Sequence, residues 1–208
     1  AERRRDPRDD LLTEAIEYRD SDGSAFDMQE LITILTIDLL ASGNETTTAA
    51  ISSGMKLLLE DPAPIAEVRR NPKLLENLAE EILRLESPAQ GMFRRCAAPS
   101  ALGGVPLEEG ALLSIRFGAA NRDPAQFPDP DRIDLHRRKP GSHLAFGAGR
   151  HVCVGAALAR QELVSAFRAI LNRLDGFRLA PGASPPRYLP SFFGRNLDAL
   201  HLRLEYLA

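Results

Sequence analysis

The sequence predicts a mainly α-helical fold with small β-sheets. One long helical pattern runs from Asp27 to Glu60, and a second begins at Asn71-Pro72. Between residues 92 and 115 the pattern changes to short β-rich runs, and an amphipathic helix is expected from about Cys153 to Leu174. With 208 residues, of which 44% are hydrophobic and 26% charged, the chain has enough apolar material for a sizeable core.

Composition and charge exclude several classes of protein. A net charge of -3 does not favour a nucleic-acid partner, which normally requires a basic excess. Only Cys96 and Cys153 are present, so no disulfide framework is expected and a reducing, cytoplasmic location is the simpler interpretation. The start AERRRDPRDD has no apolar core, and polar residues interrupt the apolar run Leu31–Leu40. We therefore expect neither a membrane anchor nor a membrane span.

The first long helix has a clear start and stop. Asp27 followed by Glu30 is the capping-box pattern, and Asp61-Pro62 ends the periodic stretch. Its middle, SGNETTT at residues 42–48, has residues that favour neither the helix nor apolar packing. A tolerated weak turn on a solvated face would explain it. The apolar runs on both sides favour a functional interruption instead.

The second helix is expected to end at Ser87-Pro88, with Glu81 and Arg84 on one face. Taken alone, this pair reads as a surface ion pair that contributes ~0.2–0.5 kcal/mol. A small sheet follows with a turn at Gly103-Gly104, and then a proline-rich loop over residues 121–143. Loops of this length inside a domain are usually functional. The last helix has its apolar stripe at Val164, Phe167, Leu171 and Leu174, and a strand is expected at residues 200–205.

The stretch AFGAGRHVCVGAALAR, residues 145–160, combines glycines with a cysteine at the start of a helix. It lacks the Gly-Lys-Ser/Thr of a phosphate-binding loop and the third glycine of a dinucleotide loop. His151 and Cys153 have no second ligand pair at zinc spacing. Amide dipoles at a helix N-terminus favour a thiolate, which is the form that binds metal. A thiolate-ligated haem iron meets these demands.

The same loop carries a resemblance to a known family. The array Phe146-Gly147-x-Gly149-x-x-x-Cys153-x-Gly155 resembles the haem-binding loop of the cytochrome P450 family, the haem-thiolate monooxygenases. Glu81-Ile82-Leu83-Arg84 is similar to the family's Glu-x-x-Arg motif, and Gly43-Asn44-Glu45-Thr46-Thr47 resembles its oxygen-activating acid–alcohol pair. The motifs occur in family order from about Asp27 onwards. They imply the C-terminal, haem-binding portion of the cytochrome P450 fold, with a long central helix, in its soluble bacterial branch.

The resemblance assigns roles to individual residues. Cys153 would be the axial ligand of the iron, with Phe146 packed beside the sulfur. The positions that match haem-binding residues are Gly147, Gly149, Gly155, Arg94, His143 and His151. Arg94, His143 and His151 would bind the haem propionates; for His143 the alternative is a solvated loop histidine. Glu45 and Thr46 would be catalytic and deliver protons, and Gly43 would leave room for dioxygen. Glu81, Arg84 and Arg132 would form a buried structural triad that holds the irregular loop.

The implied reaction inserts one oxygen atom of O2 into a small organic substrate, by hydroxylation or epoxidation, while the other leaves as water. The cofactor would be haem b, and electrons would come from NAD(P)H through a ferredoxin-type redox partner. The basic cluster Arg137, Arg138 and Lys139 would steer an acidic partner, or would be a solvated charged loop.

Members of this family are considerably longer. Residues 1–208 are therefore expected to be the C-terminal haem-binding part of a single domain whose N-terminal half is absent. The alternative is a truncated, non-catalytic remnant that acts as a helical interaction module. The presence of Cys153 together with Glu45-Thr46 favours the monooxygenase.

Overall fold

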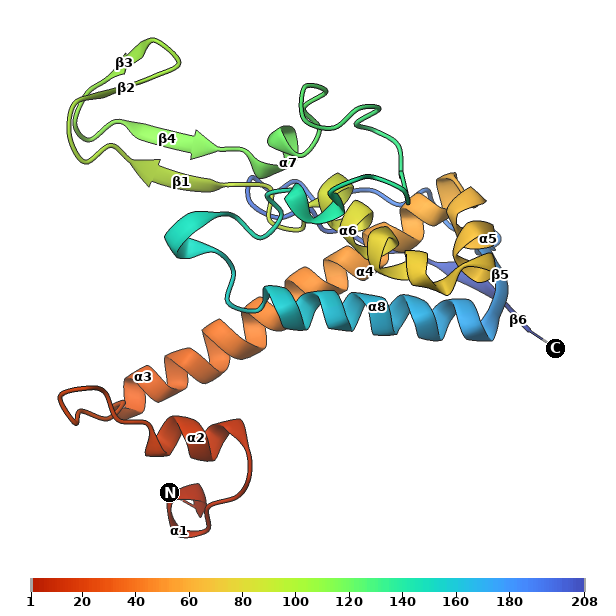
Figure 1. Ribbon diagram of the computed structural model, residues 1–208. Coiled ribbons are helices and arrows are strands. Elements are labelled where there is room, and N and C mark those ends of the chain that lie inside the picture. Colours follow the sequence, from red (N-terminus) through yellow and green to blue (C-terminus); the bar gives the residue numbers. More distant parts are fainter. Residues whose placement is uncertain (1, 208) are drawn as a thin grey trace. The chain divides into compact units, whose positions relative to one another are not determined.

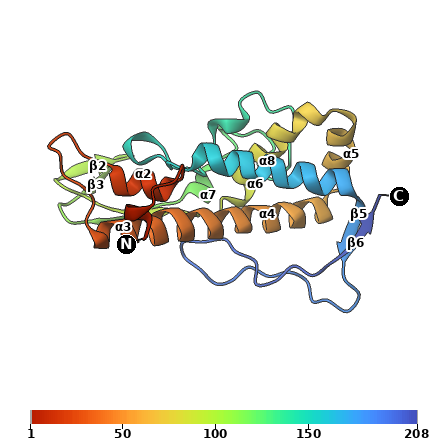
Figure 2. The same ribbon diagram turned by 90° about the horizontal axis from the view of Figure 1, so that it is seen from below.

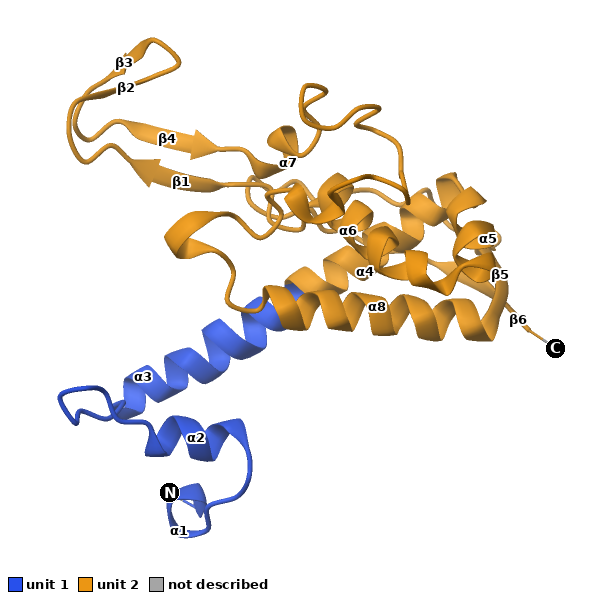
Figure 3. Cartoon of the chain, in the orientation of Figure 1, with its two compact units in different colours: residues 1–45 blue, residues 46–208 orange. Residues whose placement is uncertain are grey.

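The computed structural model describes residues 2–207, and the chain divides into two compact units, residues 1–45 and residues 46–208 (Figure 3). Within residues 2–207 the structure is mainly helical, with three two-stranded antiparallel sheets (Figure 1). The fold class predicted from the sequence is confirmed. The boundary between the units falls inside helix α4 (Ser42–Glu60), so each unit is described separately.

Unit 1 contains the short helices α1 (Glu2–Arg5) and α2 (Leu11–Glu17), which the sequence did not predict, and α3 (Met28–Thr33). The predicted capping box opens α3. The Asp27 carboxylate accepts a hydrogen bond from the Glu30 backbone N–H (2.8 Å), and the Glu30 carboxylate accepts one from the Asp27 N–H (2.9 Å). These two bonds satisfy backbone donors that a helix start otherwise leaves without partners.

The predicted long helix is present, but its geometry changes part-way. After α3, residues Ile34–Ala41 form a π-helix, η1, and α-helical geometry resumes in α4. The Ser42 hydroxyl donates to the carbonyl of Ile37, five residues earlier, at 2.9 Å. The expected weak turn at residues 42–48 is thus regular α-helix, and the departure from α-helical geometry lies before it. Hydroxyl-to-carbonyl bonds of this kind often bend a helix, in keeping with the change of geometry between η1 and α4.

The core of unit 2 lies between α4, α6 (Leu75–Glu86) and α8 (Ala156–Arg173). A Cβ on Gly54 of α4 would come within 2.6 Å of the Phe167 ring on α8 and 2.9 Å of Ile82 on α6. The helices therefore approach one another closely at this point, and α8 runs beside the unit-2 part of α4 (Figure 2). Before α6 come α5 (Ala63–Arg70), which was not predicted, and the 3₁₀ turn η2 (Pro72–Leu74).

Helix α8 starts three residues later than predicted, at Ala156. Its buried stripe is Leu163, Phe167 and Leu171, so Leu163 takes the place expected for Val164, which is only half-buried. Leu174, buried as expected, begins strand β5 (Leu174–Leu179) instead of ending the helix. The strand expected near the end of the chain is β6 (Leu202–Tyr206), which pairs with β5.

The predicted sheet consists of β1 (Met92–Arg95) paired with β4 (Leu112–Ile115), and of a hairpin of β2 (Ser100–Leu102) and β3 (Val105–Leu107). The hairpin turn is at Gly103 (φ +57°) and Gly104 (φ +81°), as predicted. The short helix α7 (Phe117–Ala120) follows β4.

Residues 121–143 form the expected irregular loop, with only the 3₁₀ turn η3 (Pro140–Ser142) near its end. Asn121 holds the start of this loop. Its side chain is fully buried, donates to the Ser87 hydroxyl (2.8 Å) and accepts from the backbone N–H of Leu144 (2.6 Å). Through these bonds α6, the irregular loop and the glycine-rich loop after it are joined at one point.

Candidate active site

The glycine-rich loop, residues 145–155, is anchored on one side and open on the other. Ala145 is buried in the core, and Phe146 packs against it. The backbone N–H of Cys153 donates to the carbonyl of Phe146 at 2.9 Å and closes the loop. Gly147 and Gly149 have left-handed backbones (φ +71° and +73°), so glycine is favoured at both positions by conformation.

Cys153 is a free, exposed thiol two residues before Gly155, the N-cap of α8. Its neighbours are apolar and unusually exposed: Val152 is 52%, Val154 103% and Leu158 53% exposed. A Cβ on Gly155 would lie 3.9 Å from the Cys153 sulfur, in ordinary contact. A thiol surrounded by exposed aliphatic side chains fits a flat, largely apolar ligand that binds through its metal.

Arg94 and His151, the other two side chains predicted to bind carboxylates of the cofactor, are both at the surface of unit 2. Arg94, on β1, is exposed and donates to the Phe93 carbonyl (2.8 Å); His151, in the 3₁₀ turn η4 (Gly149–His151), is also exposed. Within residues 2–207, neither side chain forms an ion pair with a carboxylate. The structure therefore leaves both side chains at the surface, and their role toward a cofactor stays a prediction.

The prediction that His143 binds a propionate is wrong. Its side chain is fully buried, Nε2 lies 2.9 Å from the Glu80 carboxylate, and Nδ1 accepts a hydrogen bond from the Ala145 N–H (3.2 Å). With both ring nitrogens engaged, the imidazole has no donor left for a haem carboxylate. The alternative of a solvated histidine is wrong for the same reason.

Glu80, His143 and Arg160 make up a charge cluster that sequence reasoning missed, here called the Glu80 cluster. Glu80 Oε1 accepts from Arg160 Nε (2.5 Å), and Oε2 from Arg160 Nη2 (3.2 Å). Burial alone would raise the pKa of Glu80, but the hydrogen bonds to His143 and Arg160 outweigh it and lower the pKa from 4.5 to about 2. The carboxylate is thus held ionised. The only sequence signal was a second glutamate before the Glu-x-x-Arg motif.

The predicted triad is present with a different third member. Glu81 and Arg84 are both 0% exposed, and their two-pronged salt bridge has N···O distances of 2.7 and 2.9 Å. The Arg132 side chain is exposed, and only its carbonyl takes part, accepting from Arg84 (3.0 Å). Arg137 instead donates to Glu81 at 2.9 Å. The Glu81 cluster is therefore Glu81, Arg84 and Arg137; the assignment of Arg132 is wrong because its side chain points to solvent.

A third carboxylate of α6, Glu86, holds the segment near the end of the chain. It is 2% exposed, accepts from the Tyr188 hydroxyl (2.6 Å) and accepts from Arg195 Nε (2.8 Å). Burial and the neighbouring Glu86 charge raise the pKa of Tyr188. Three acidic residues of one helix thus each fix a different segment of unit 2.

The predicted acid–alcohol pair lies in the first turn of α4, where Glu45 and Thr46 are exposed. A Cβ on Gly43 would meet no atom within 4 Å, so the backbone there is open to its surroundings. The next residue, Thr47, donates to the Glu162 carboxylate on α8 at 3.1 Å. Glu162 is a further acidic group beside this segment that sequence reasoning did not identify.

An exposed aromatic cluster lies on unit 2. Phe93 of β1 stacks on Phe192 (ring centroids 5.7 Å apart) and meets Phe193 edge-on (5.5 Å). Arg116 covers the Phe192 ring at 4.7 Å and donates to its carbonyl (3.1 Å). The rings of Phe192 and Phe193 are more than half exposed, which makes this an apolar surface available to a ligand.

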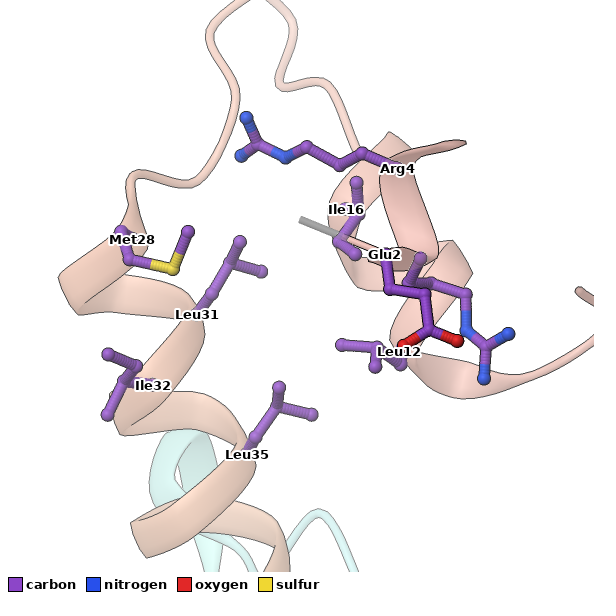
Figure 4. A pocket seen from close by; sticks show the side chains of 9 residues that line it. Glu2, Arg4, Leu12, Ile16, Met28, Leu31, Ile32 and Leu35 are labelled. Carbon is purple, nitrogen blue, oxygen red and sulfur yellow. The ribbon is translucent and has the colours of Figure 1, made fainter. Parts of the chain in front are cut away.

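Unit 1 contains a separate apolar pocket of about 330 Å³ (Figure 4). Leu31 and Leu35 point toward Leu12 and Ile16, while Arg4 and Glu2 lie at its edge (Figure 4). No residue predicted to bind the cofactor lines it.

Residues 1–195 match the family model described as Cytochrome P450. The chain belongs to the cytochrome P450 family. It is 42% identical over 204 residues to cytochrome P450 107B1 and 40% identical over 203 residues to 6-deoxyerythronolide B hydroxylase, both from Saccharopolyspora erythraea. Each match covers 98% of this chain and 50% of the relative. This P450 chain therefore spans about half the length of the curated relatives it matches.

Solved P450 structures show the same fold. The substrate-free form of CYP150A6 from Mycobacterium marinum matches 100% of the chain and 52% of its own length, with a TM-score of 0.91 and 32% identity. CYP109E1 from Bacillus megaterium, in complex with testosterone, matches 97% of the chain and 54% of its own length (TM-score 0.88, 33% identity). The prediction of a P450 fold is confirmed. Within residues 2–207, no helix of this P450 is long and apolar enough to cross a bilayer.

Proposed function

We propose that this chain is the haem-binding, C-terminal part of a haem-thiolate monooxygenase, with Cys153 as the axial ligand of haem b. The observation that carries the proposal is the free, exposed Cys153 thiol on the open side of a loop anchored in the core. When bound, the haem would activate dioxygen, so that one oxygen atom enters a small organic substrate by hydroxylation or epoxidation and the other leaves as water.

The residues around the loop would bind the cofactor by its chemistry. Val152, Val154 and Leu158 would cover apolar parts of the macrocycle, while Arg94 and His151 would face its carboxylates. Phe146 would pack beside the sulfur. Support comes from exposure: these aliphatic groups and the side chains of Arg94 and His151 are at the surface of unit 2.

Glu45 and Thr46 would move protons to the reaction site, Glu45 as the titratable group and Thr46 as the hydroxyl that holds the proton in place. Gly43 would leave space for dioxygen beside this turn. The Thr47–Glu162 hydrogen bond supports the idea that hydroxyl and carboxylate groups pair along this face of α4.

Electrons would come from NAD(P)H through a ferredoxin-type redox partner in the cytoplasm. Arg138 and Lys139 are exposed and would attract an acidic partner, whereas Arg137 is committed to Glu81. The proposal of a cytoplasmic location is supported by Cys96 and Cys153, both free thiols. Relatives named as a hydroxylase and as a monooxygenase, the latter PikC from Streptomyces venezuelae at 38% identity, support the reaction class.

The test is the spectrum of the reduced carbon monoxide complex after haem loading. We expect the strongly red-shifted Soret band of thiolate ligation in the parent and in Cys96→Ser, and its loss in Cys153→Ser. Cys96 is the matched control because it is the chain's other free thiol. An unchanged band in Cys153→Ser would contradict the assignment, and no band in the parent would contradict the proposed function of this chain.

A further inference from the structure

The Glu80 cluster joins three elements that surround the glycine-rich loop. Glu80 is on α6, His143 precedes the loop, and Arg160 is in the second turn of α8. Because the Ala145 N–H donates to His143 Nδ1, the ring proton must be on Nε2, which donates to Glu80 (2.9 Å). The imidazole therefore bridges a carboxylate and the backbone at Ala145, the first residue of the glycine-rich loop.

The backbone of η3, just before the glycine-rich loop, also lies against this carboxylate. A Cβ on Gly141 would come within 3.3 Å of Glu80 Oε2. The His143 side chain is 0% exposed and that of Glu80 13%, whereas Arg160 retains 36%. The carboxylate and imidazole are thus shielded from water, and their hydrogen bonds restrict the start of the loop more than surface contacts would.

The cluster continues from Arg160 to the backbone of the cysteine. The Arg160 guanidinium lies 4.6 Å from the centre of the Phe146 ring, a cation–π contact. The Phe146 carbonyl in turn accepts the Cys153 N–H at 2.9 Å. Glu80 holds the guanidinium through both carboxylate oxygens, so it fixes the plane that Arg160 presents to Phe146.

We propose that Glu80 is a positioning residue: through Arg160 and His143 it fixes Phe146, and through Phe146 it fixes the backbone of Cys153 and so the direction of its sulfur. This inference rests on the proposed function for its consequence at the iron. The coupling from Glu80 to the Cys153 backbone is independent of the cofactor, so it can be tested on the chain without haem.

The first measurement is hydrogen exchange at the Cys153 amide in the haem-free chain. In Glu80→Gln and in Arg160→Lys, which keeps the charge but loses the planar guanidinium over Phe146, we expect exchange to be faster by about tenfold, as for loss of one charge-assisted hydrogen bond. Glu76→Gln, an exposed glutamate of α6, and Arg168→Lys, an exposed arginine of α8, are matched controls and should leave this amide unchanged. The expected change is local to the Cys153 amide, so the free energy of global unfolding need not change in the variants.

The second measurement is the carbon monoxide spectrum after haem loading. We expect both variants to bind haem with a smaller fraction of the thiolate band than the parent, and both controls to match the parent. The proposal would be overturned if, in both variants, the Cys153 amide exchanged as slowly as in the parent and the thiolate band made up the same fraction of the spectrum. If Glu80→Gln fails to fold, Arg160→Lys decides, since its side chain is partly exposed. A parent without the thiolate band would contradict the proposed function, while the exchange result would still decide the coupling.

Discussion

Glu80 and Glu81 are consecutive residues of α6, but they organise different parts of the molecule in different ways. Glu81 is sealed from water and is held by two arginines. Glu80 faces another side of the helix, as successive residues must, and is held by a histidine and a half-exposed arginine. The comparison teaches that one carboxylate is fully buried and holds the irregular loop, whereas the other is slightly exposed and is linked to the cysteine loop.

The largest expected effect on stability is from breaking the Glu81 cluster. Arg84→Ala leaves the Glu81 charge buried with one partner fewer and removes hydrogen bonds to the carbonyls of Asn121 and Pro130. We expect the free energy of unfolding to fall by about 3–5 kcal/mol, with loss of haem incorporation. Urea unfolding and haem content measure this. Arg168→Ala, an exposed arginine of unit 2, is the control; a similar loss in both variants, or parental stability in Arg84→Ala, would contradict the account.

A smaller effect tests which arginine completes the network. Arg137→Ala removes one of the donors to Glu81 and should lower the free energy of unfolding by about 1–3 kcal/mol. Arg132→Ala should change it by less than about 0.5 kcal/mol, because its side chain is exposed and its carbonyl is retained. A larger loss of stability in Arg132→Ala than in Arg137→Ala would show that Arg132, and not Arg137, is the third member of the triad.

The contribution of the Glu80 cluster to stability should change with pH in acid. Since the folded-state pKa of Glu80, about 2, is below its ordinary value of 4.5, its ionised form stabilises the fold fully above about pH 4.5. This stabilisation is lost as the pH falls from 4.5 toward 2. We expect Glu80→Gln to lack that part of the acid dependence, measured as the unfolding midpoint in urea at several pH values, while Glu76→Gln retains it. Parallel curves for the parent and Glu80→Gln would contradict the stabilising role of the ionised Glu80 carboxylate.

The smallest effect on stability is expected away from both networks. Thr46→Ala should leave folding, haem content and substrate binding largely intact in the full-length protein, because one exposed hydroxyl is lost. Product formed per NAD(P)H consumed should fall, whereas Glu45→Gln should mainly slow turnover. Side-by-side measurement of NAD(P)H, peroxide and product separates the two. If Thr46→Ala forms as much product per NAD(P)H consumed as the parent, Thr46 is not the proton-delivering alcohol.

Local patterns predicted most of the framework. The Asp27 cap, the Gly103-Gly104 turn and the end of α6 at Ser87 could be predicted from short-range signals, and they were confirmed. The start predicted at Asn71-Pro72 was wrong: Asn71 makes no side-chain cap hydrogen bond, and α6 begins at Leu75 after the 3₁₀ turn η2. The π-helical segment could not be predicted, because its residues are almost all apolar and such a run does not distinguish a π-helix from an α-helix. Helix α5 was not predicted, and its N-cap, Pro62, has no side chain that can accept a capping hydrogen bond.

The site was predictable as far as its motifs reach. Cys153, Glu81 and Arg84 occur in recognisable spacings, but the partners of buried charges come from distant segments. Arg137, not Arg132, reaches Glu81 because the loop between them turns, and His143 meets Glu80 across 63 positions of chain. Which side chain of a basic, irregular loop points inward depends on tertiary packing, and no periodic pattern carries that information.

The central claim is that α6 holds a loop whose Cys153 sulfur binds iron. The most direct test is iron K-edge X-ray absorption of the haem-loaded chain. We predict one sulfur neighbour at the iron in the parent and in Cys96→Ser, and none in Cys153→Ser. An iron with only nitrogen and oxygen neighbours in the parent, or a sulfur neighbour that persists in Cys153→Ser, would contradict it.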